Sequence, residues 1–223
     1  MKTFWLHNNN NDKIILFFAG WGQDPEPFLP LPSDSYDVLM AYDYAEGNPK
    51  IDLREIVTGY REAYLVGWSM GVWFAQEAVI GNEDLFDGKF AVNGTLNPLD
   101  DEFGIPPKIF QGTYLAFSEV TRKKFFQRMC YKSAGASLFF DHSPKRDLDS
   151  QKAELKFMLD VSKEDPQKRN IFSKAIIGEN DLIFPSQNQK NYWEGKVETI
   201  SMDQPHFPFY AWPSWDEFLR VFS

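Results

Sequence analysis

Residues 67–71 read Gly67-Trp68-Ser69-Met70-Gly71, so a serine stands two positions from a glycine on each side. The apolar residues 63–66 precede this pattern and the helix-compatible residues 72–79 follow it, which predicts a sharp turn from a strand into a helix. A serine hydroxyl is a good nucleophile only when a base removes its proton, and such a turn holds it where a histidine can reach. The glycines leave room for the crowded backbone. The helix N-terminus directs N–H groups at a developing oxyanion. Ser69 is therefore a candidate nucleophile for acyl transfer.

Chance alone gives this serine pattern in roughly one chain in fifteen of this length, so an ordinary turn is the alternative. The order of the later polar residues supports the nucleophile. In the α/β-hydrolase fold, an acid and then a histidine follow the serine along the chain. Here Asp181 follows the apolar residues 175–177, and His206 follows the strand-like residues 196–202. Because catalytic groups in open α/β sheets gather at the carboxyl ends of strands, we expect Ser69, Asp181 and His206 to meet.

The choice of base and acid rests on position. Of the three histidines, His7 and His142 lie in polar loop segments, and His206 alone follows a late strand. Asp203 precedes His206 by only three residues and is poorly placed to reach the far nitrogen of its ring. We therefore expect Asp181 to be the acid that orients His206.

A second glycine-rich turn belongs to the same predicted site. Residues 14–19 form a continuous apolar run, typical of a strand buried on both faces, and end in Gly20-Trp21-Gly22. In this fold, the loop after that strand donates one N–H group to the oxyanion and the residue after the nucleophile donates another. The expected donors are the backbone N–H groups of Trp21 and Met70, although an ordinary glycine turn is an equal alternative for the first of these.

Composition restricts the class of protein. The 223 residues suit one domain, or one domain with a small insertion. No apolar stretch is long enough to span a membrane, and the first residues do not resemble a signal peptide. The single cysteine, Cys130, excludes an internal disulfide and fits the cytoplasm; its apolar neighbours indicate a buried thiol. A net charge of −9 argues against nucleic acid as a partner, and the sequence shows no metal-binding or phosphate-binding motif. We expect no metal and no cofactor.

Alternating strands and helices predict a mostly parallel, doubly wound sheet. The expected strands are Thr3–Leu6, Lys13–Ala19, Tyr36–Tyr42, Ala63–Trp68, Phe90–Asn93, Ser173–Ile177 and Lys196–Ser201. Asp52 and Ser214 stand where side chains cap the first turn of a helix, and both precede apolar residues at helical spacing.

Residues 113–170 break this alternation, because they are rich in Lys and Arg and have helical periodicity. We expect a helical cap there, over a core formed by residues 1–112 and 171–223; an ordinary excursion of connecting helices is the alternative. Trp68, Trp73 and Phe207 flank the predicted site and are candidates to line an apolar substrate slot.

Several stretches together resemble the BioG-type pimeloyl-acyl carrier protein methyl esterases, a small α/β-hydrolase family. They are Phe18-Ala19-Gly20-Trp21-Gly22, Tyr42-Asp43-Tyr44, Gly67-Trp68-Ser69-Met70-Gly71-Val72-Trp73, Val92-Asn93-Gly94-Thr95, Gly104-Ile105-Pro106-Pro107 and Phe125-Phe126-Gln127-Arg128-Met129. The chain is also similar to the BioH-type esterases, and it differs from many hydrolases in carrying Ala19 where they have histidine.

The resemblance implies hydrolysis of the methyl ester of pimeloyl-acyl carrier protein, with release of methanol, in biotin precursor synthesis. A general carboxylesterase or thioesterase and a non-catalytic acyl-binding protein are the alternatives. Acyl carrier proteins are acidic, so docking needs a local basic face. Lys124, Arg128 and Lys132 would form one stripe if residues 121–132 are helical, and the competing interpretation is a solvated charged face. A second basic group is Lys145, Arg146 and Lys152.

Overall fold

The computed structural model describes residues 1–45, 52–161 and 170–222, which are built around one seven-stranded sheet. Within these residues the strand order is β1-β3-β2-β4-β5-β6-β7; β1 runs antiparallel to β3, and the other pairings are parallel. The strands are β1 (Lys2–His7), β2 (Lys13–Phe18), β3 (Asp37–Tyr42), β4 (Glu62–Trp68), β5 (Gly88–Val92), β6 (Lys174–Gly178) and β7 (Glu198–Met202). All seven strands expected from the sequence are confirmed, with ends that differ by one or two residues.

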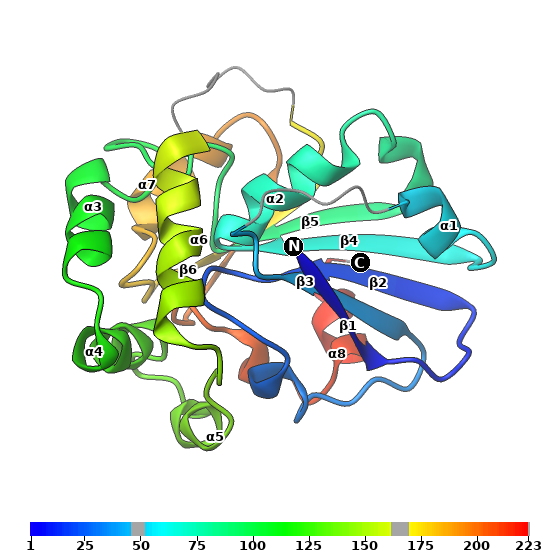
Figure 1. Cartoon of the computed structure of the whole chain (residues 1–223). Helices are drawn as coiled ribbons and strands as arrows, with labels where there is room; N and C mark the ends of the chain where they lie inside the picture. Colours follow the sequence, from blue (N-terminus) through cyan, green and yellow to red (C-terminus); the bar gives the residue numbers. More distant parts are fainter. Residues whose placement is uncertain (46–51, 162–169, 223) are drawn as a thin grey trace.

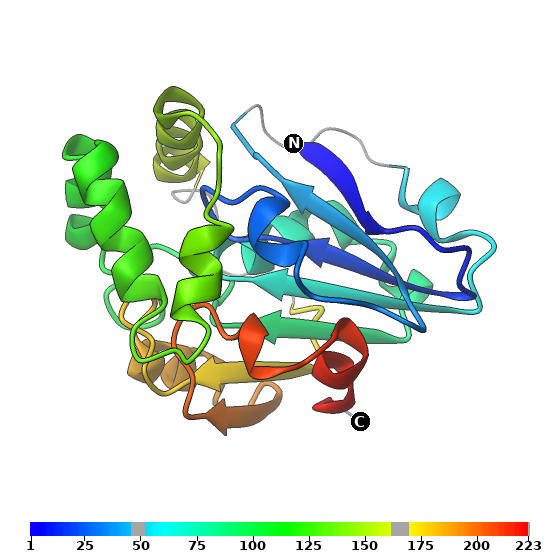
Figure 2. The same ribbon diagram turned by 90° about the horizontal axis from the view of Figure 1, so that it is seen from below.

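Helices cover both faces of the sheet (Figures 1 and 2). α1 and α2 lie on one face and α8 lies on the other, while α7 packs beside β6. The helices are α1 (Leu53–Val57), α2 (Met70–Val79), α3 (Pro107–Leu115), α4 (Glu119–Met129), α5 (Ala136–Asp141), α6 (Leu148–Val161), α7 (Ser186–Trp193) and α8 (Trp215–Arg220), with short 3-10 turns at Glu26–Phe28, Glu83–Leu85 and Phe209–Ala211. The doubly wound α/β architecture is therefore as expected.

Local sequence explains several of these elements. Residues 14–18 of β2 are fully buried, as expected for a central strand with both faces covered. The Asp52 side chain accepts a hydrogen bond from the Glu55 N–H, and the Ser214 side chain accepts one from the Glu217 N–H, so both predicted caps start their helices.

Helices α3 to α6 lie between β5 and β6 in the sequence, beyond the carboxyl ends of the parallel strands (Figure 2). This is where a cap must lie to cover the predicted site. The expected boundary at residues 112 and 113 falls inside α3, and residues 162–169 and 223 lie outside the described residues. The exact division into core and cap stays a prediction. No helix among the described residues has both the length and the apolar character required to cross a bilayer.

Candidate active site

Ser69 occupies the turn between β4 and α2, and its backbone has φ 58° and ψ −125°. Residues other than glycine seldom have positive φ, and such strained residues concentrate at functional sites. A Cβ atom on Gly71 would lie 2.1 Å from the carbonyl oxygen of Phe18. A Cβ atom on Gly67 would lie 2.8 Å from the Cα atom of Val72. Close backbone contacts therefore require both glycines of the pattern.

Two contacts join the side chains of Ser69, His206 and Asp181. Nε2 of His206 lies 2.9 Å from Oγ of Ser69, and Nδ1 of the same ring lies 2.8 Å from Oδ2 of Asp181. All three residues are buried. Asp203 is exposed, and its carboxylate accepts a hydrogen bond from the Asn180 side chain. The structure thus brings together the three residues named from the sequence, and it places Asp181 rather than Asp203 against the histidine.

The carboxylate of Asp181 is held by several donors besides the histidine. Its Oδ1 accepts hydrogen bonds from the backbone N–H groups of Ile183 and Phe184, each at 2.8 Å. Its Oδ2 accepts a hydrogen bond from Nε2 of Gln189, a fully buried residue of α7, at 3.1 Å. These hydrogen bonds fix the orientation of the carboxylate against the imidazole, as the acid that orients a catalytic histidine requires.

The segment that carries His206 is fixed through its backbone. The carbonyl oxygen of His206 accepts hydrogen bonds from Nε1 of Trp68 at 2.8 Å and from Nδ2 of Asn93 at 3.0 Å. Oδ1 of Asn93 accepts the N–H of Gly178 at 2.6 Å, so this side chain links the ends of β5 and β6 to the histidine loop. Sequence analysis missed the roles of Asn93 and Gln189. The position of Asn93 directly after a strand was the available signal.

The predicted oxyanion donors lie beside Ser69. Trp21 is in the turn after β2, Met70 is the first residue of α2, and both line the pocket that contains Ser69. Within the described parts of the chain, neither backbone N–H group has a hydrogen-bond acceptor. Buried backbone N–H groups are nearly always paired. Two unpaired ones at this place fit the expected role, which stays a prediction.

An apolar pocket opens onto Ser69, walled by the cap helices α3, α4 and α6 and by the loop after β6. Its lining residues are Gly20, Trp21, Trp68, Ser69, Met70, Ile105, Ile109, Phe110, Thr113, Phe125, Arg128, Met129, Leu155, Leu182, Ile183 and His206. Arg128 contributes a permanent charge to this lining. Most of the other lining side chains are apolar, so the pocket suits a hydrocarbon chain.

Of the three aromatic residues expected to line the slot, the structure places only Trp68 there. Trp73 packs edge-on against Phe74, with ring centroids 5.0 Å apart. Phe207 is buried in the aromatic core, where its ring lies 4.9 Å from that of Phe139. Neither residue lines the pocket, so we assign Trp73 and Phe207 no substrate contact.

The expected basic stripe is shorter than the sequence suggests. Lys124 and Arg128 are exposed and lie one turn apart on α4. The helix ends at Met129, whose carbonyl oxygen accepts the N–H of Phe207 at 3.0 Å. Lys132 lies beyond this end with φ 60°, so the expectation that it continues the stripe is wrong.

Arg146, the centre of the alternative basic group, is not available to a partner. Its side chain is only 7% exposed, and its guanidinium pairs with Asp43 and Glu154, each at 2.7 Å. Lys145 beside it is exposed and pairs with Glu26 at 2.8 Å.

The remaining reactive groups of the described residues offer little further chemistry. The buried Cys130 is confirmed as a core thiol. Burial raises the pKa of Cys130 to about 12, so the thiol is protonated at neutral pH and is a poor nucleophile. No group of three His, Cys, Asp or Glu side chains among the described residues is placed to hold a metal ion.

Residues 1–218 match the sequence profile of the family described as "Pimeloyl-ACP methyl esterase BioG". The chain belongs to the BioG family. A crystal structure of BioG from Haemophilus influenzae superposes on this BioG-family chain with a TM-score of 0.86 and 33% identity, covering 97% of this chain and 98% of the other.

Two curated relatives are similar in sequence to this BioG-family chain. An uncharacterized protein of Haemophilus influenzae is 35% identical over 218 residues, covering 96% of this chain and 97% of that protein. A malonyl-[acyl-carrier protein] O-methyltransferase of Bacteroides fragilis is 38% identical over 197 residues, covering 87% of this chain. The chain spans only 39% of the length of that methyltransferase.

More distant solved structures share the fold alone. A putative non-heme bromoperoxidase, BpoC from Mycobacterium tuberculosis, matches with a TM-score of 0.65 at 14% identity, covering 99% of this chain and 94% of the other. Together with the strand order, these likenesses establish the α/β-hydrolase fold.

Proposed function

We propose that this BioG-family chain is a serine esterase that hydrolyses the methyl ester of pimeloyl-acyl carrier protein in biotin precursor synthesis. The observation that carries the proposal is the contact chain from Ser69 through His206 to Asp181 at the base of an apolar pocket. Membership of a family described as pimeloyl-ACP methyl esterases supports the choice of substrate. We also propose a cytoplasmic location, which suits a single buried thiol.

The proposed mechanism follows from the distances between the side chains. His206 takes the proton of Ser69 through Nε2 while Ser69 Oγ attacks the ester carbonyl, and Asp181 stabilises the imidazolium. The backbone N–H groups of Trp21 and Met70 bind the oxyanion of the tetrahedral intermediate. His206 then protonates the departing methoxide, and methanol leaves. Water repeats the sequence on the acyl-enzyme and releases the free carboxylate, with no cofactor or metal in any step.

The apolar lining of the pocket supports a substrate with a methylene chain. The methyl ester end must reach Ser69, so the methylene chain would lie against apolar residues such as Phe110, Phe125 and Leu155. We propose that the thioester end then lies near Arg128, which lines the pocket and is exposed. Lys124 is one helical turn away on the same helix, and we propose that these two cations contact the acidic carrier protein.

Two other functions fit parts of the same site. A general carboxylesterase or thioesterase would use the same three residues on free acyl substrates. A non-catalytic acyl-binding protein would use only the pocket. The hydrogen-bonded contact between Ser69 and His206 favours an enzyme, because an acyl-binding protein has no need of an activated hydroxyl.

The deciding experiment compares purified protein on methyl pimeloyl-carrier protein and on free methyl esters, with Ser69→Ala as the matched control. We expect methanol from the carrier-bound ester, with kcat/KM at least tenfold above that for free monomethyl pimelate. Equal efficiency would indicate a general esterase, and cleavage of the thioester would indicate a thioesterase. Absence of any hydrolysis, together with no labelling by a serine-directed fluorophosphonate, would indicate a binding protein.

A further inference from the structure

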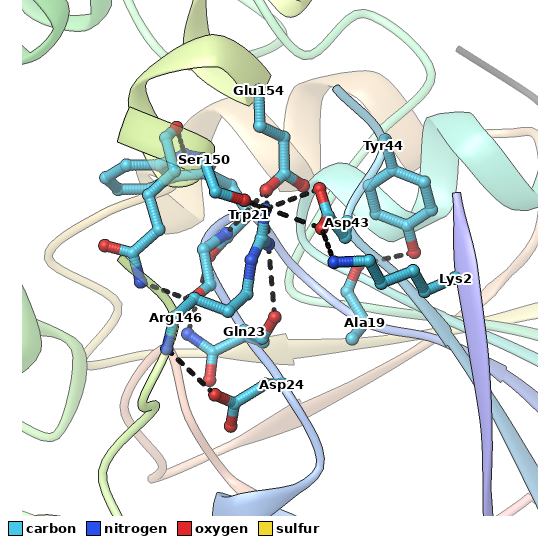
Figure 3. Close-up of polar contacts among 12 residues, drawn as sticks. Lys2, Ala19, Trp21, Gln23, Asp24, Asp43, Tyr44, Arg146, Ser150 and Glu154 are labelled. Atoms are coloured by element: carbon cyan, nitrogen blue, oxygen red, sulfur yellow. Dashed lines mark hydrogen bonds and ion pairs between the residues drawn. The ribbon is translucent and has the colours of Figure 1, made fainter. Parts of the chain in front are cut away.

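A buried polar cluster connects the turn after β2 to helix α6, outside the three residues of the proposed mechanism (Figure 3). Glu154 of α6 is fully buried, and its Oε2 accepts the backbone N–H of Gly22 at 3.2 Å. The same oxygen accepts a hydrogen bond from Nη1 of Arg146 at 2.7 Å. A carboxylate in the cap thus holds the backbone next to Trp21.

Gln151, a second residue of α6, also forms hydrogen bonds with the turn after β2. Nε2 of Gln151 donates to the carbonyl oxygen of Gly22 at 2.8 Å. The backbone carbonyl of Gln151 accepts a hydrogen bond from Nε1 of Trp21 at 2.8 Å. Gly22 is therefore bound through both its N–H and its C=O groups, and Trp21 is bound through its indole.

Arg146 ties the cluster to the sheet. Its Nη2 donates to Oδ1 of Asp43 at 2.7 Å, and its Nη1 also donates to the carbonyl oxygen of Gln23 at 3.2 Å. Asp43 follows β3 directly and has φ 58°. The hydroxyl of its neighbour Tyr44 donates to the carbonyl oxygen of Ala19 at 3.0 Å, at the start of the same turn (Figure 3).

We infer that Glu154, assisted by Gln151 and Arg146, is a positioning residue that aims the Trp21 N–H at the oxyanion. The inference rests on the proposed function and deepens it. An oxyanion donor must be held in place before the reaction, and small displacements cost much of its effect. Glycine stands on each side of Trp21 and gives the turn little stiffness of its own, so rigidity must come from outside.

The chemistry of the cluster suits this task. A charged acceptor makes a stronger hydrogen bond to a backbone N–H than a neutral one. Burial raises the pKa of Glu154, and the adjacent Arg146 guanidinium opposes that rise. The guanidinium of Arg146, 2.7 Å from Oε2, supplies the opposite charge that a buried carboxylate requires. Leu155, the next residue of α6, lines the substrate pocket, so the helix that shapes the pocket also holds the oxyanion turn.

The test replaces the acceptor while keeping the volume of the side chain. We expect Glu154→Met to lower kcat for a small methyl ester by about 10-fold to 100-fold, with KM changed less than twofold. Glu154→Gln retains an oxygen that can accept the Gly22 N–H, so it should recover part of the loss. Gln151→Met leaves no unpaired charge and should show a smaller loss of kcat. If Glu154→Met does not fold, the kcat of Gln151→Met tests whether α6 positions the turn.

Two further measurements separate positioning from general damage. A trifluoromethyl ketone that adds to Ser69 forms an oxyanion, so its affinity should fall in Glu154→Met by the same factor as kcat/KM. Amide exchange at Gly22 should become faster in that variant, whereas exchange at Ser69, whose N–H donates to the Val92 carbonyl, should not change.

Asp37→Asn is the matched control. Asp37 is also a buried carboxylate that accepts backbone N–H groups, those of Asn9 and Asn11, but it lies at the amino end of β3, away from the site. We expect this variant to lower the thermal midpoint of unfolding and to keep kcat within twofold.

The inference is overturned if folded Glu154→Met keeps more than half of the wild-type kcat. It is also overturned if that variant loses kcat without a parallel loss of ketone affinity. Failure of the proposed function is a separate result: wild-type protein would then neither hydrolyse esters nor react with the ketone, and Gly22 exchange alone would show whether Glu154 holds the turn.

Discussion

At the scale of single residues, the unusual backbone conformation of Ser69 accounts for the position of its hydroxyl. A residue with φ 58° is held against its own preference by the close contacts of the flanking glycines. This conformation presents Oγ to His206 at 2.9 Å. Alanine keeps the Cβ atom of Ser69 and removes only the hydroxyl that contacts His206.

Replacing Ser69 by alanine should remove activity and leave the fold intact. Loss of the nucleophile typically lowers turnover by about 10⁴-fold or more. Methanol release measures the first effect, and circular dichroism with a thermal melt measures the second. A folded Ser69→Ala protein that keeps a tenth of wild-type turnover would show that another group is the nucleophile.

Asp181 and Asp203 are the two candidates for the acid that orients His206, and the same substitution can be made at each. Asp181→Asn should lower kcat by about 10⁴-fold, because an amide at this place favours the wrong tautomer of His206. Asp203→Asn removes an exposed carboxylate that contacts Asn180, so kcat should stay within about threefold. Steady-state kinetics on both purified variants tests the assignment, which the opposite ranking would refute.

At the scale of elements, α4 contributes both to the wall of the pocket and to the proposed docking surface. Its buried face carries Phe125 and Met129 into the pocket wall. Arg128 lines the same pocket and is also exposed, and Lys124 is exposed one turn earlier on the helix. Its last carbonyl, that of Met129, binds the N–H of Phe207 directly after His206. A helix anchored in this way can present cations to a partner while its position relative to the histidine is preserved.

Reversing both charges of α4, in Lys124→Glu with Arg128→Glu, should reduce kcat/KM on the carrier-bound ester by about tenfold or more. The new glutamates repel the acidic carrier protein, which slows the encounter and weakens the docked complex. Hydrolysis of a small soluble ester should fall much less than hydrolysis of the carrier-bound ester, because Ser69, His206 and Asp181 are untouched and only Arg128 of the two replaced residues lines the pocket. Steady-state assays on the two substrates give the comparison.

The control for this change is Arg54→Glu with Arg220→Glu, which alters the net charge equally on α1 and α8, outside the cap. It should leave both activities nearly unchanged. Equal losses on both substrates in the α4 variant would indicate a damaged cap, and no loss on either would mean that the carrier protein docks elsewhere.

At the scale of the whole molecule, the net charge of −9 opposes the approach of an acidic carrier protein. The repulsion between net charges and the attraction to the cations of α4 differ in range. Repulsion between net charges acts over long distances and is already weak at physiological ionic strength, where screening sets in at about 8 Å. Attraction to the α4 cations acts at contact, so it decides the stability of the docked complex.

Activity on the carrier-bound ester should therefore fall as salt rises from about 0.05 to 0.5 M, chiefly through an increase in KM, since added salt screens exposed charge pairs. Activity on a small neutral ester should change little over the same range and serves as the control. The measurement is KM for each substrate at several salt concentrations, and a flat or rising carrier activity would contradict electrostatic docking.

The sequence by itself determined the sheet and the three central residues. The apolar runs predicted all seven strands, and the serine pattern predicted the sharp turn in which neither Gly67 nor Gly71 has room for a Cβ atom. Ser69, Asp181 and His206 each stand just after a predicted strand. The carboxyl ends of parallel strands meet at one edge, so chain order was enough to predict that the three residues meet.

Tertiary structure alone decided which side chains support that site. Asn93 binds the carbonyl of a residue more than a hundred positions away, and Glu154 binds the N–H of Gly22 across a similar distance. Such contacts depend on how the cap lies on the sheet, which local periodicity does not encode. A residue that is next to a site residue in the sequence need not point its side chain into the site, because neighbouring side chains in a strand or turn point to different faces. Phe207 for that reason lies in the core, although it follows His206 directly.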